Sequence, residues 1–344
     1  MKGAGIMKMH DPLMIGVTDC TLRDGGYVNE HRFTTHQVVH TVTSLVDAGV
    51  DLVEVGYFRR DSKPIGVTAY CPDSLLELLP LEHKGRLAVM ARPGVVKPSD
   101  VIALRDSAVS HIRIPARLDE IEAGFRLMRV ARECGLKVCF NVIRVSELSI
   151  DALQGLLHQI KNIQPEVLFF ADSNGAMFPS QVEKLIRFAR EQVDIPLGFH
   201  AHDNLGFAVA NAMAAVTGGA RWIDSTVGGL GKGGGNASTE AILTLVAGLT
   251  GRTIQLSRLL DAVSIYPEGL FPPRMQSRIE SSLFGLYNCN LETIARLKAV
   301  ATDNFEQIHE QLQAMSINHE LPVDCLSEKL KCWWRSAVCG LTTG

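Results

Sequence analysis

The feature that most constrains the fold is a regular alternation of short apolar runs and amphipathic stretches between residues 13 and 250. The runs are almost continuously apolar, which predicts strands that are covered on both faces. The stretches between them repeat apolar residues every three to four positions, as amphipathic helices do. The predicted strands are LMIGVTDC, DLVEVGY, RLAVMAR, SHIRIP, KVCFNVIR, VLFFAD, IPLGFHAH and RWIDSTV.

This alternation amounts to eight strand–helix units in about 240 residues, which is the length and period of a (β/α)₈ TIM barrel. We therefore predict an α/β fold with a TIM-barrel catalytic domain over residues 13–252. An open, doubly wound sheet is the structural alternative, and the short helix around SLLELL makes the second unit the weakest. Beyond this domain, helices alternate with Pro-containing loops, which predicts a helical C-terminal extension over 253–344.

Composition excludes several classes of function. The 344 residues carry a formal net charge of −3, so no broad basic surface favours binding to nucleic acid or a membrane. No run approaches the roughly 20 apolar residues that span a bilayer, and the N-terminus lacks the apolar centre of a signal peptide. The eight cysteines form no CxxC pair. We expect reduced thiols in a cytoplasmic protein, with Cys20 as a small buried side chain.

Polar residues follow strands that would be neighbours in the closed barrel. In a TIM barrel the chemistry lies at the C-terminal ends of the strands. Arg23 and Asp24 follow the first predicted strand, and His200 and His202 lie at the end of the seventh. One carboxylate and two imidazoles can bind Mn²⁺, Fe²⁺, Co²⁺ or Zn²⁺ and leave coordination positions open. The sequence therefore predicts a metal site formed by Asp24, His200 and His202.

Three further side chains could belong to this site. Asn236, after the glycine-rich GGLGKGGG, could add an oxygen ligand or cap the helix that begins near STEAIL. Arg23 would stabilise an oxygen that becomes negative in the transition state, and it could also pair with Asp24 or Glu54. Glu54, in the second predicted strand, is in addition a candidate for contact with the substrate.

Two other chemistries are not favoured. GGLGKGGG is not a P-loop, because Lys232 is followed by Gly233 rather than by Ser or Thr. Its glycines would instead let the backbone approach a substrate or metal closely, and Lys232 is either a substrate contact or solvated. A Schiff-base lysine is also disfavoured, because the one lysine inside a strand run, Lys137, lies at the N-terminal end of that run.

Five motifs together resemble those of the DRE-TIM metallolyase superfamily, over about residues 15–250. They are TLRDGG, VEVG, ADSNGAM, HAHDNLG and GLGKGGGNASTE. The superfamily includes 3-hydroxy-3-methylglutaryl-CoA (HMG-CoA) lyase, the isopropylmalate and homocitrate synthases, and 4-hydroxy-2-oxovalerate aldolase, and ADSNGAM and the tail are most similar to the aldolases. The resemblance implies Mn²⁺, or else Mg²⁺, Co²⁺ or Zn²⁺, on Asp24, His200 and His202, with Arg23 stabilising an enolate.

The resemblance also implies roles for four other residues. Ser173 in ADSNGAM would contact the oxo-acid end of the substrate, and Tyr287 in SLFGLYNCN resembles an active-site tyrosine of the aldolases. In those aldolases a histidine three residues after the metal-binding aspartate helps to deprotonate the substrate hydroxyl, whereas here that residue is Tyr27. Tyrosine, with an ordinary pKa near 10, is a poorer base than imidazole. His31 could substitute, although we expect it to lie on the surface.

The function expected from these residues is a divalent-metal aldolase that cleaves or forms a carbon–carbon bond of a 4-hydroxy-2-oxo acid through the enolate of pyruvate. A Claisen-type acyltransferase that condenses an acyl-CoA with a 2-oxo acid is the alternative, although such synthases are usually longer. An Fe²⁺ enzyme of oxygen chemistry is disfavoured by the barrel and the Arg-Asp pair. A partner scaffold without activity conflicts with the intact ligand set.

The resemblance suggests one protein partner. In related aldolases the C-terminal region docks an aldehyde dehydrogenase that takes the aldehyde. The tail of this chain departs from theirs in KCWWRS, at 331–336, and FPP, at 271–273. A homodimer is compatible with the sequence.

Overall fold

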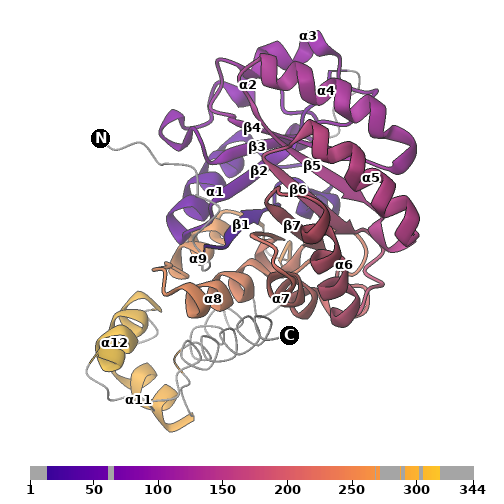
Figure 1. The fold of residues 1–344 in the computed structure, drawn as a ribbon. Helices are drawn as coiled ribbons and strands as arrows, with labels where there is room; N and C mark the ends of the chain where they lie inside the picture. The colour runs from indigo at the N-terminus through magenta and orange to yellow at the C-terminus, as the bar shows by residue number, and fades with distance from the viewer. Residues whose placement is uncertain are drawn as a thin grey trace.

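A computed structural model describes residues 14–60, 66–267, 269–271, 287, 291–301 and 305–317, and within them eight parallel strands form a closed barrel (Figure 1). Each strand pairs with the next along the chain, and β8 pairs with β1. This closure confirms the predicted TIM barrel and excludes the open sheet. The strands are β1 (Gly16–Asp19), β2 (Leu52–Tyr57), β3 (Leu87–Met90), β4 (His111–Ala116), β5 (Lys137–Ile143), β6 (Val167–Asp172), β7 (Leu197–Ala201) and β8 (Trp222–Ser225).

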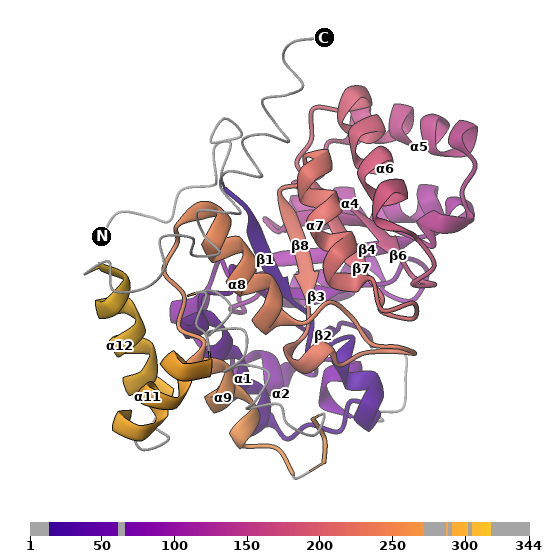
Figure 2. The same ribbon diagram turned by 90° about the horizontal axis from the view of Figure 1, so that it is seen from below.

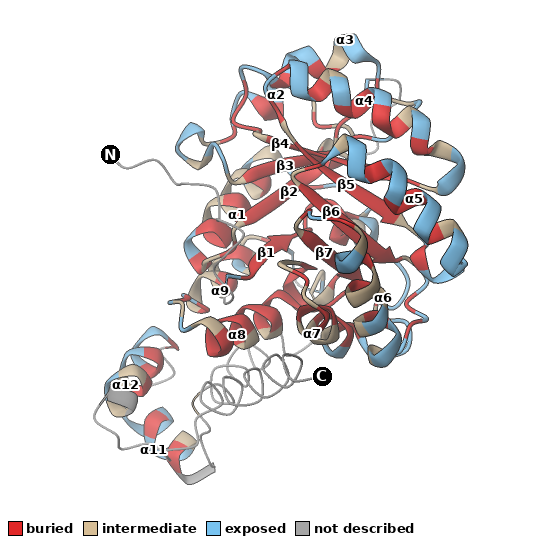
Figure 3. Cartoon of the chain, viewed as in Figure 1, coloured by how far each residue is buried: buried red, intermediate tan, exposed pale blue. Residues whose placement is uncertain are grey.

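Helices cover the outside of the barrel, and Figure 3 shows buried strands inside helices whose outer faces are exposed. The second unit has a helix of only four residues, as its sequence predicted, and the helix of the third unit is equally short. The helices are α1 (Thr35–Ala48), α2 (Asp73–Leu76), α3 (Pro98–Val101), α4 (Ile121–Glu133), α5 (Ile150–Ile163), α6 (Pro179–Gln192), α7 (Ala208–Gly218) and α8 (Thr239–Thr250).

Local signals set the ends of α1. Thr34 and Gln37 form a capping box, in which each side chain accepts a hydrogen bond from the backbone amide of the other residue. The helix ends at Gly49, whose φ of +106° lies in the region that glycine adopts without strain. Such signals mark both ends of the helix in the local sequence.

The barrel interior has its own small apolar cluster at the N-terminal end of the strands. Cys139, Val167 and Phe169 pack together with Trp222, apart from the larger core between strands and helices. Gly16 makes room for this cluster, because a Cβ there would lie 2.7 Å from the indole ring of Trp222. The interior at this end is therefore filled by side chains, which leaves the C-terminal end of the strands for a functional site.

Helices continue beyond the barrel, as the sequence predicted. α9 (Ser257–Ser264) packs on α1, and the hydroxyl groups of Thr41 and Tyr266 are 2.5 Å apart at this contact. α11 (Leu291–Ala301) and α12 (Phe305–Ile317) lie farther out (Figure 2). None of the helices in the described ranges has the length and apolar character needed to cross a membrane. The predicted boundary at residue 252 stays a prediction, and KCWWRS and the prolines of FPP lie outside the described residues.

Asp19, at the end of β1, is expected to make stability depend on pH. Its carboxylate accepts hydrogen bonds from the Thr21 amide at 2.8 Å and the Thr239 hydroxyl at 2.6 Å, but burial raises its pKa to about 6. The folded state therefore binds this proton more tightly than the unfolded chain, where Asp titrates near 3.9. The resulting stability is present below about pH 4 and is lost as the pH rises through about 6.

The variant Asp19→Asn is therefore expected to remove about 3 kcal/mol of the fall in unfolding free energy between about pH 4 and about pH 7. Urea unfolding at the two pH values measures this difference. Asp194→Asn, at an exposed position, is the matched control and should keep the wild-type pH dependence. An Asp19→Asn protein with the same pH dependence as the wild type would contradict the prediction.

Candidate active site

The loop after β1 turns sharply, and this turn places Arg23 and Asp24 at the barrel mouth. The amides of Arg23, Asp24 and Gly25 all donate to the carbonyl oxygen of Cys20, over 3.1, 2.7 and 3.2 Å. The hydroxyl of Thr21 accepts from the amide of Val227 at 2.8 Å. This last bond ties the loop after β1 to the loop after β8, so residues from the two ends of the barrel domain meet.

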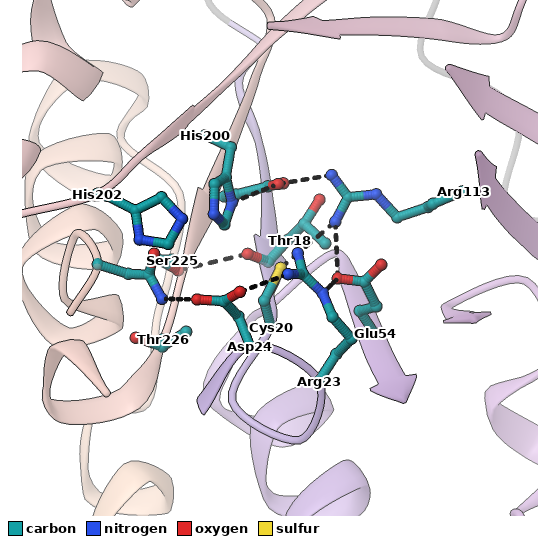
Figure 4. Close-up of polar contacts among 12 residues, drawn as sticks. Thr18, Cys20, Arg23, Asp24, Glu54, Arg113, His200, His202, Ser225 and Thr226 are labelled. Atoms are coloured by element: carbon teal, nitrogen blue, oxygen red, sulfur yellow. Dashed lines mark hydrogen bonds and ion pairs between the residues drawn. The ribbon is translucent and has the colours of Figure 1, made fainter. Parts of the chain in front are cut away.

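Asp24, His200 and His202 converge at this mouth, as predicted (Figure 4). One ligand atom from each residue lies within 4.8 Å of the others, and all three residues are buried. His200 belongs to β7, whereas His202 forms an isolated bridge with Asn236 in the loop after β8. Asp24 lies more than 170 residues before the two histidines in the sequence, and the fold brings its carboxylate close to both imidazoles.

Hydrogen bonds orient both imidazole rings. Nδ1 of His200 is 3.0 Å from Oδ2 of Asp224, and Nδ1 of His202 is 3.2 Å from the carbonyl oxygen of Gly235. Each partner is an acceptor, so Nδ1 carries the proton and Nε2 keeps a free lone pair. Burial, followed by the charge of His200, lowers the pKa of His202 to about 4. His202 is therefore neutral at pH 7, the state that binds metal ions.

Asp24 is held in its ionised form. Burial favours the neutral acid, but Arg23, the two histidines and a hydrogen bond from Asn236 lower the pKa of Asp24 to about 2. Nδ2 of Asn236 donates to Oδ2 of Asp24 at 2.6 Å, whereas its Oδ1 is buried without a hydrogen-bond partner among the described residues. Ser238 takes the N-cap position of α8, so the capping alternative for Asn236 is wrong.

These residues fit a divalent cation. The donor set comprises the ionised carboxylate of Asp24, the neutral imidazole of His202, the imidazole of His200 and the unsatisfied amide oxygen of Asn236. Among the described residues, the three carboxylates of Asp24, Glu54 and Asp224 pair with the guanidinium groups of Arg23 and Arg113, and Asp224 also contacts His200. Asp24 is thus ionised in a buried place, and a bound cation would help to compensate its negative charge.

A second group of possible ligands shares His200. It consists of Cys20, His200 and Asp224. Burial raises the pKa of the Cys20 thiol well above its usual value, and Oδ2 of Asp224 already accepts from Arg113 and from His200. Although Oδ1 of Asp224 has no hydrogen-bond partner among the described residues, a protonated thiol is a poor ligand. The set around Asp24 is the better cation site, and Cys20 is buried, as expected.

Arg23 pairs with both predicted partners. Its Nε donates to Oε2 of Glu54 and its Nη1 to Oδ1 of Asp24, each over 2.6 Å. The side chain of Glu54 has no exposed surface, and the same Oε2 accepts from Arg113 at 3.1 Å. Arg113 and Asp224 were missed in the sequence. The available signal was a charged residue inside each of the apolar strands HIRIP and WIDS.

An aromatic cluster of Tyr27, His31 and Tyr57 lies beside Arg23. The hydroxyl groups of Tyr27 and Tyr57 are 2.9 Å apart, and the Arg23 guanidinium carbon lies 6.0 Å from the centre of the Tyr57 ring. Burial raises the pKa of Tyr57 well above its usual value. Tyr57 ends β2 directly after VEVG, and this position at a strand end was the signal that sequence reasoning missed.

The expectation that His31 lies on the surface is wrong. His31 is only 6% exposed, and its Nδ1 is 3.1 Å from the hydroxyl of Thr68. The 3₁₀ turn Gly25–Asn29 folds the chain back, so that the ring lies against Gly26, where a Cβ would be 2.3 Å from Nδ1. Burial and the charge of Arg23 lower the pKa of His31. The imidazole can occupy this buried position because Gly26 has no side chain.

The structure places the other candidate residues as follows. Ser173, after β6, is partly exposed, and its hydroxyl accepts from the amide of Arg144 at 3.0 Å. Tyr287 is partly buried, with its ring 6.3 Å from that of His309 in α12. Lys232 is exposed. The predicted roles of Ser173 and Tyr287 in binding and catalysis stay predictions.

Gly231 is expected to be essential for metal binding. A Cβ at this position would lie 2.1 Å from Nδ2 of Asn236 and 2.8 Å from Oδ2 of Asp24. Gly231→Ala should therefore displace both side chains and weaken Mn²⁺ binding about 10–100-fold, the usual effect of disturbing residues that hold a ligand. Isothermal titration measures the affinity. Gly155→Ala, with open space around the added methyl group, is the control, and equal affinities of the two variants would contradict the prediction.

Comparisons with known proteins identify the family to which the chain belongs. A model of the HMGL-like family matches residues 112–265. The chain is 32% identical to the 4-hydroxy-2-oxovalerate aldolase of Pelotomaculum thermopropionicum over 256 residues, which cover 73% of this chain and 76% of that protein. The chain belongs to the HMGL-like family. With several curated aldolases among its relatives, this HMGL-like protein is an enzyme of the carbon–carbon lyase type.

Two solved structures resemble the fold of this HMGL-like protein. The N-terminal domain of a protein described as an aldolase from Bacteroides vulgatus has a TM-score of 0.65 and 26% identity, covering 82% of this chain and 99% of that one. HMG-CoA lyase of Bacillus subtilis has a TM-score of 0.66 and 19% identity, covering 78% and 98%. The latter likeness concerns the fold alone.

Proposed function

We propose that this HMGL-like enzyme is a divalent-metal-dependent aldolase that cleaves, or forms, the C3–C4 bond of a 4-hydroxy-2-oxo acid. The products of cleavage would be pyruvate and an aldehyde. The observation that carries the proposal is the buried set of Asp24, His200 and His202 with Arg23 bound to Asp24. The similarity to 4-hydroxy-2-oxovalerate aldolases supports the substrate class.

The residues would hold the cation and the developing enolate side by side. Asp24, His200 and His202 would bind the cation, with Asn236 as a further oxygen ligand. When bound, a divalent cation supplies Lewis acidity to the carboxylate and ketone oxygens of a 2-oxo acid, and Mn²⁺ suits this mixed nitrogen and oxygen donor set. Ser173 would contact the oxo-acid end of the substrate.

Arg23 would stabilise the negative oxygen of the pyruvate enolate. Its ion pairs with Glu54 and Asp24 use two of the five N–H groups of the guanidinium and fix its plane. The remaining donors are available to an oxygen beside Asp24. Preorganised donors of this kind need no rearrangement as charge develops, and this preorganisation is the main source of their effect. Glu54, fully buried, would act by positioning Arg23 and not by contact with the substrate.

Tyr27, as its phenolate, would take the proton of the 4-hydroxyl group as the C3–C4 bond breaks; the enolate would then take a proton from water at C3, and the resulting hydroxide would take the proton back from Tyr27. Its hydroxyl lies at the barrel mouth, 2.9 Å from that of Tyr57. Tyr57 stays protonated because burial raises its pKa, so its hydroxyl can donate a hydrogen bond to the phenolate oxygen of Tyr27. Tyr287, in the motif SLFGLYNCN, would be a second catalytic tyrosine.

A direct assay tests the function. Purified protein with Mn²⁺ should release pyruvate from a panel of 4-hydroxy-2-oxo acids, and it should exchange the methyl protons of pyruvate with deuterium in D₂O, followed by NMR. The absence of both reactions would contradict the proposal. Release of free thiol from acetyl-CoA in the presence of 2-oxo acids would instead indicate the Claisen-type acyltransferase.

Tyr27→Phe is expected to separate cleavage from enolisation. Loss of the general base should lower kcat for cleavage about 10²-fold. Exchange of the pyruvate methyl protons should be less affected, because it does not involve the 4-hydroxyl group. NMR follows both reactions in one sample. Tyr70→Phe, outside the aromatic cluster, is the matched control, and a Tyr27→Phe enzyme with wild-type cleavage would show that another residue is the base.

A further inference from the structure

Arg113 is a charged side chain in the middle of β4, with no exposed surface. Its neighbours Ile112 and Ile114 belong to the core between strands and helices. Because side chains alternate along a strand, Arg113 points the other way, into the barrel. There its guanidinium carbon lies 4.4 Å from the centre of the Phe169 ring, part of the apolar cluster that fills the N-terminal end. Arg113 thus lies between this cluster and the candidate metal site.

One guanidinium group joins two carboxylates of the site (Figure 4). Nη2 of Arg113 donates to Oδ2 of Asp224 over 2.5 Å, and Nη1 donates to Oε2 of Glu54 over 3.1 Å. Both acceptor oxygens are shared. Oδ2 of Asp224 also contacts Nδ1 of His200, at 3.0 Å, and Oε2 of Glu54 also accepts from Nε of Arg23, at 2.6 Å. A chain of buried hydrogen bonds therefore runs from His200 through Asp224, Arg113 and Glu54 to Arg23.

The contacts of Arg113 with Asp224 and with Glu54 each affect a side chain at the barrel mouth. The Asp224 link determines which nitrogen of His200 carries the proton and so leaves Nε2 for a cation. The Glu54 link fixes the guanidinium plane of Arg23. A planar guanidinium can bind the two carboxylates at once through separate nitrogens, whereas the single ammonium of lysine cannot reproduce this geometry.

Packing alone does not explain an arginine at this position. A buried ionic network can often be replaced by apolar side chains of similar volume without loss of stability. An apolar side chain at position 113 would pack against the ring of Phe169, over which the guanidinium of Arg113 lies. What an apolar side chain would lose is the connection between Asp224 and Glu54.

We propose that Arg113 is a positioning residue that couples the cation site to Arg23, by holding Asp224 against His200 and Glu54 against Arg23. The proposal deepens the proposed function and rests on it. Arg113 does not touch the substrate or the cation; it acts through these two carboxylates. Its loss should therefore weaken cation binding and enolisation together, whereas loss of either carboxylate should act mainly on its own side.

Three single variants and one double variant test this coupling with Mn²⁺ itself as the probe. Arg113→Lys is expected to weaken Mn²⁺ affinity about 10–100-fold and also to slow pyruvate methyl exchange at saturating Mn²⁺. Asp224→Asn should weaken Mn²⁺ affinity to a similar extent, and Glu54→Gln should mainly slow the exchange. The double variant Arg113→Lys/Asp224→Asn should bind Mn²⁺ as tightly as whichever of its two single variants has the lower affinity. The reason is that both substitutions remove the same contact, between Arg113 and Asp224. Isothermal titration and NMR measure the two quantities.

The outcomes are distinguishable. Arg221→Lys, just before β8 at the opposite end of the barrel, is the matched control and should keep wild-type Mn²⁺ affinity. Wild-type Mn²⁺ affinity in a folded Arg113→Lys protein, or additive losses of Mn²⁺ affinity in the double variant, would overturn this inference. Neither result would contradict the proposed function. If Arg113→Lys does not fold, unchanged Mn²⁺ affinity in Asp224→Asn overturns the inference. A wild-type protein that binds no Mn²⁺ would overturn the proposed function, and this inference with it.

Discussion

Replacing Arg23 with lysine is expected to lower kcat for aldol cleavage by on the order of 10²–10³-fold, the usual effect of removing a donor to a developing oxyanion. Lysine keeps the positive charge, but its single ammonium cannot bind Glu54, Asp24 and the enolate oxygen in one plane. Mn²⁺ affinity should change much less, because Arg23 is not a ligand. Steady-state kinetics at saturating Mn²⁺, with isothermal titration beside it, checks both statements.

A matched control for this variant lies on the outside of the barrel. Arg187 in α6 also forms an ion pair with a carboxylate, that of Glu183, at a partly exposed position. Arg187→Lys should therefore keep wild-type kcat and Mn²⁺ affinity. If Arg23→Lys loses Mn²⁺ affinity in proportion to its activity, Arg23 supports the cation site and is not the enolate-stabilising group.

Asp24→Asn is expected to abolish tight Mn²⁺ binding. The substitution keeps the shape of the side chain but removes the negative charge that the buried cluster offers to a cation. The loss of affinity should exceed the roughly 10–100-fold that follows from changing a residue that only holds a ligand. Activity should fall with it at micromolar Mn²⁺ and should recover only partly at higher concentrations. Titration of the metal-free protein with Mn²⁺ provides the measurement.

Exposed Asp194 offers the control for this experiment. Asp194→Asn removes the same charge far from the ligand set and should bind Mn²⁺ like the wild type. Wild-type Mn²⁺ affinity in Asp24→Asn would show that the cation lies elsewhere, and the set of Cys20, His200 and Asp224 would then be the next place to look.

The convergence of Asp24, His200 and His202 could be predicted because these residues lie at strand ends. Once the alternation indicated a closed barrel, strand order alone placed Asp24 beside His200 and His202. The sequence could not decide between ligand and cap for Asn236. The cap is excluded by where α8 begins, and Asn236 instead donates to Asp24 over 2.6 Å, across 212 residues.

The residues that support the site could not be predicted in the same way. Arg113 and Asp224 were read as parts of apolar strands, because strand periodicity does not say which face looks into the barrel. His31 was expected at the surface for a similar reason. Its burial depends on the turn at Gly25–Asn29 and on Thr68, which comes from a loop 37 residues away.

The sequence by itself determined the barrel and the ring of polar residues at its mouth, because hydrophobic periodicity and strand ends are local properties of the chain. Only the tertiary structure decided how those residues are held. Burial, shared hydrogen bonds and the neutral state of His202 arise from side chains on different strands that meet inside the barrel. No local pattern records such meetings, because closure of the barrel creates them.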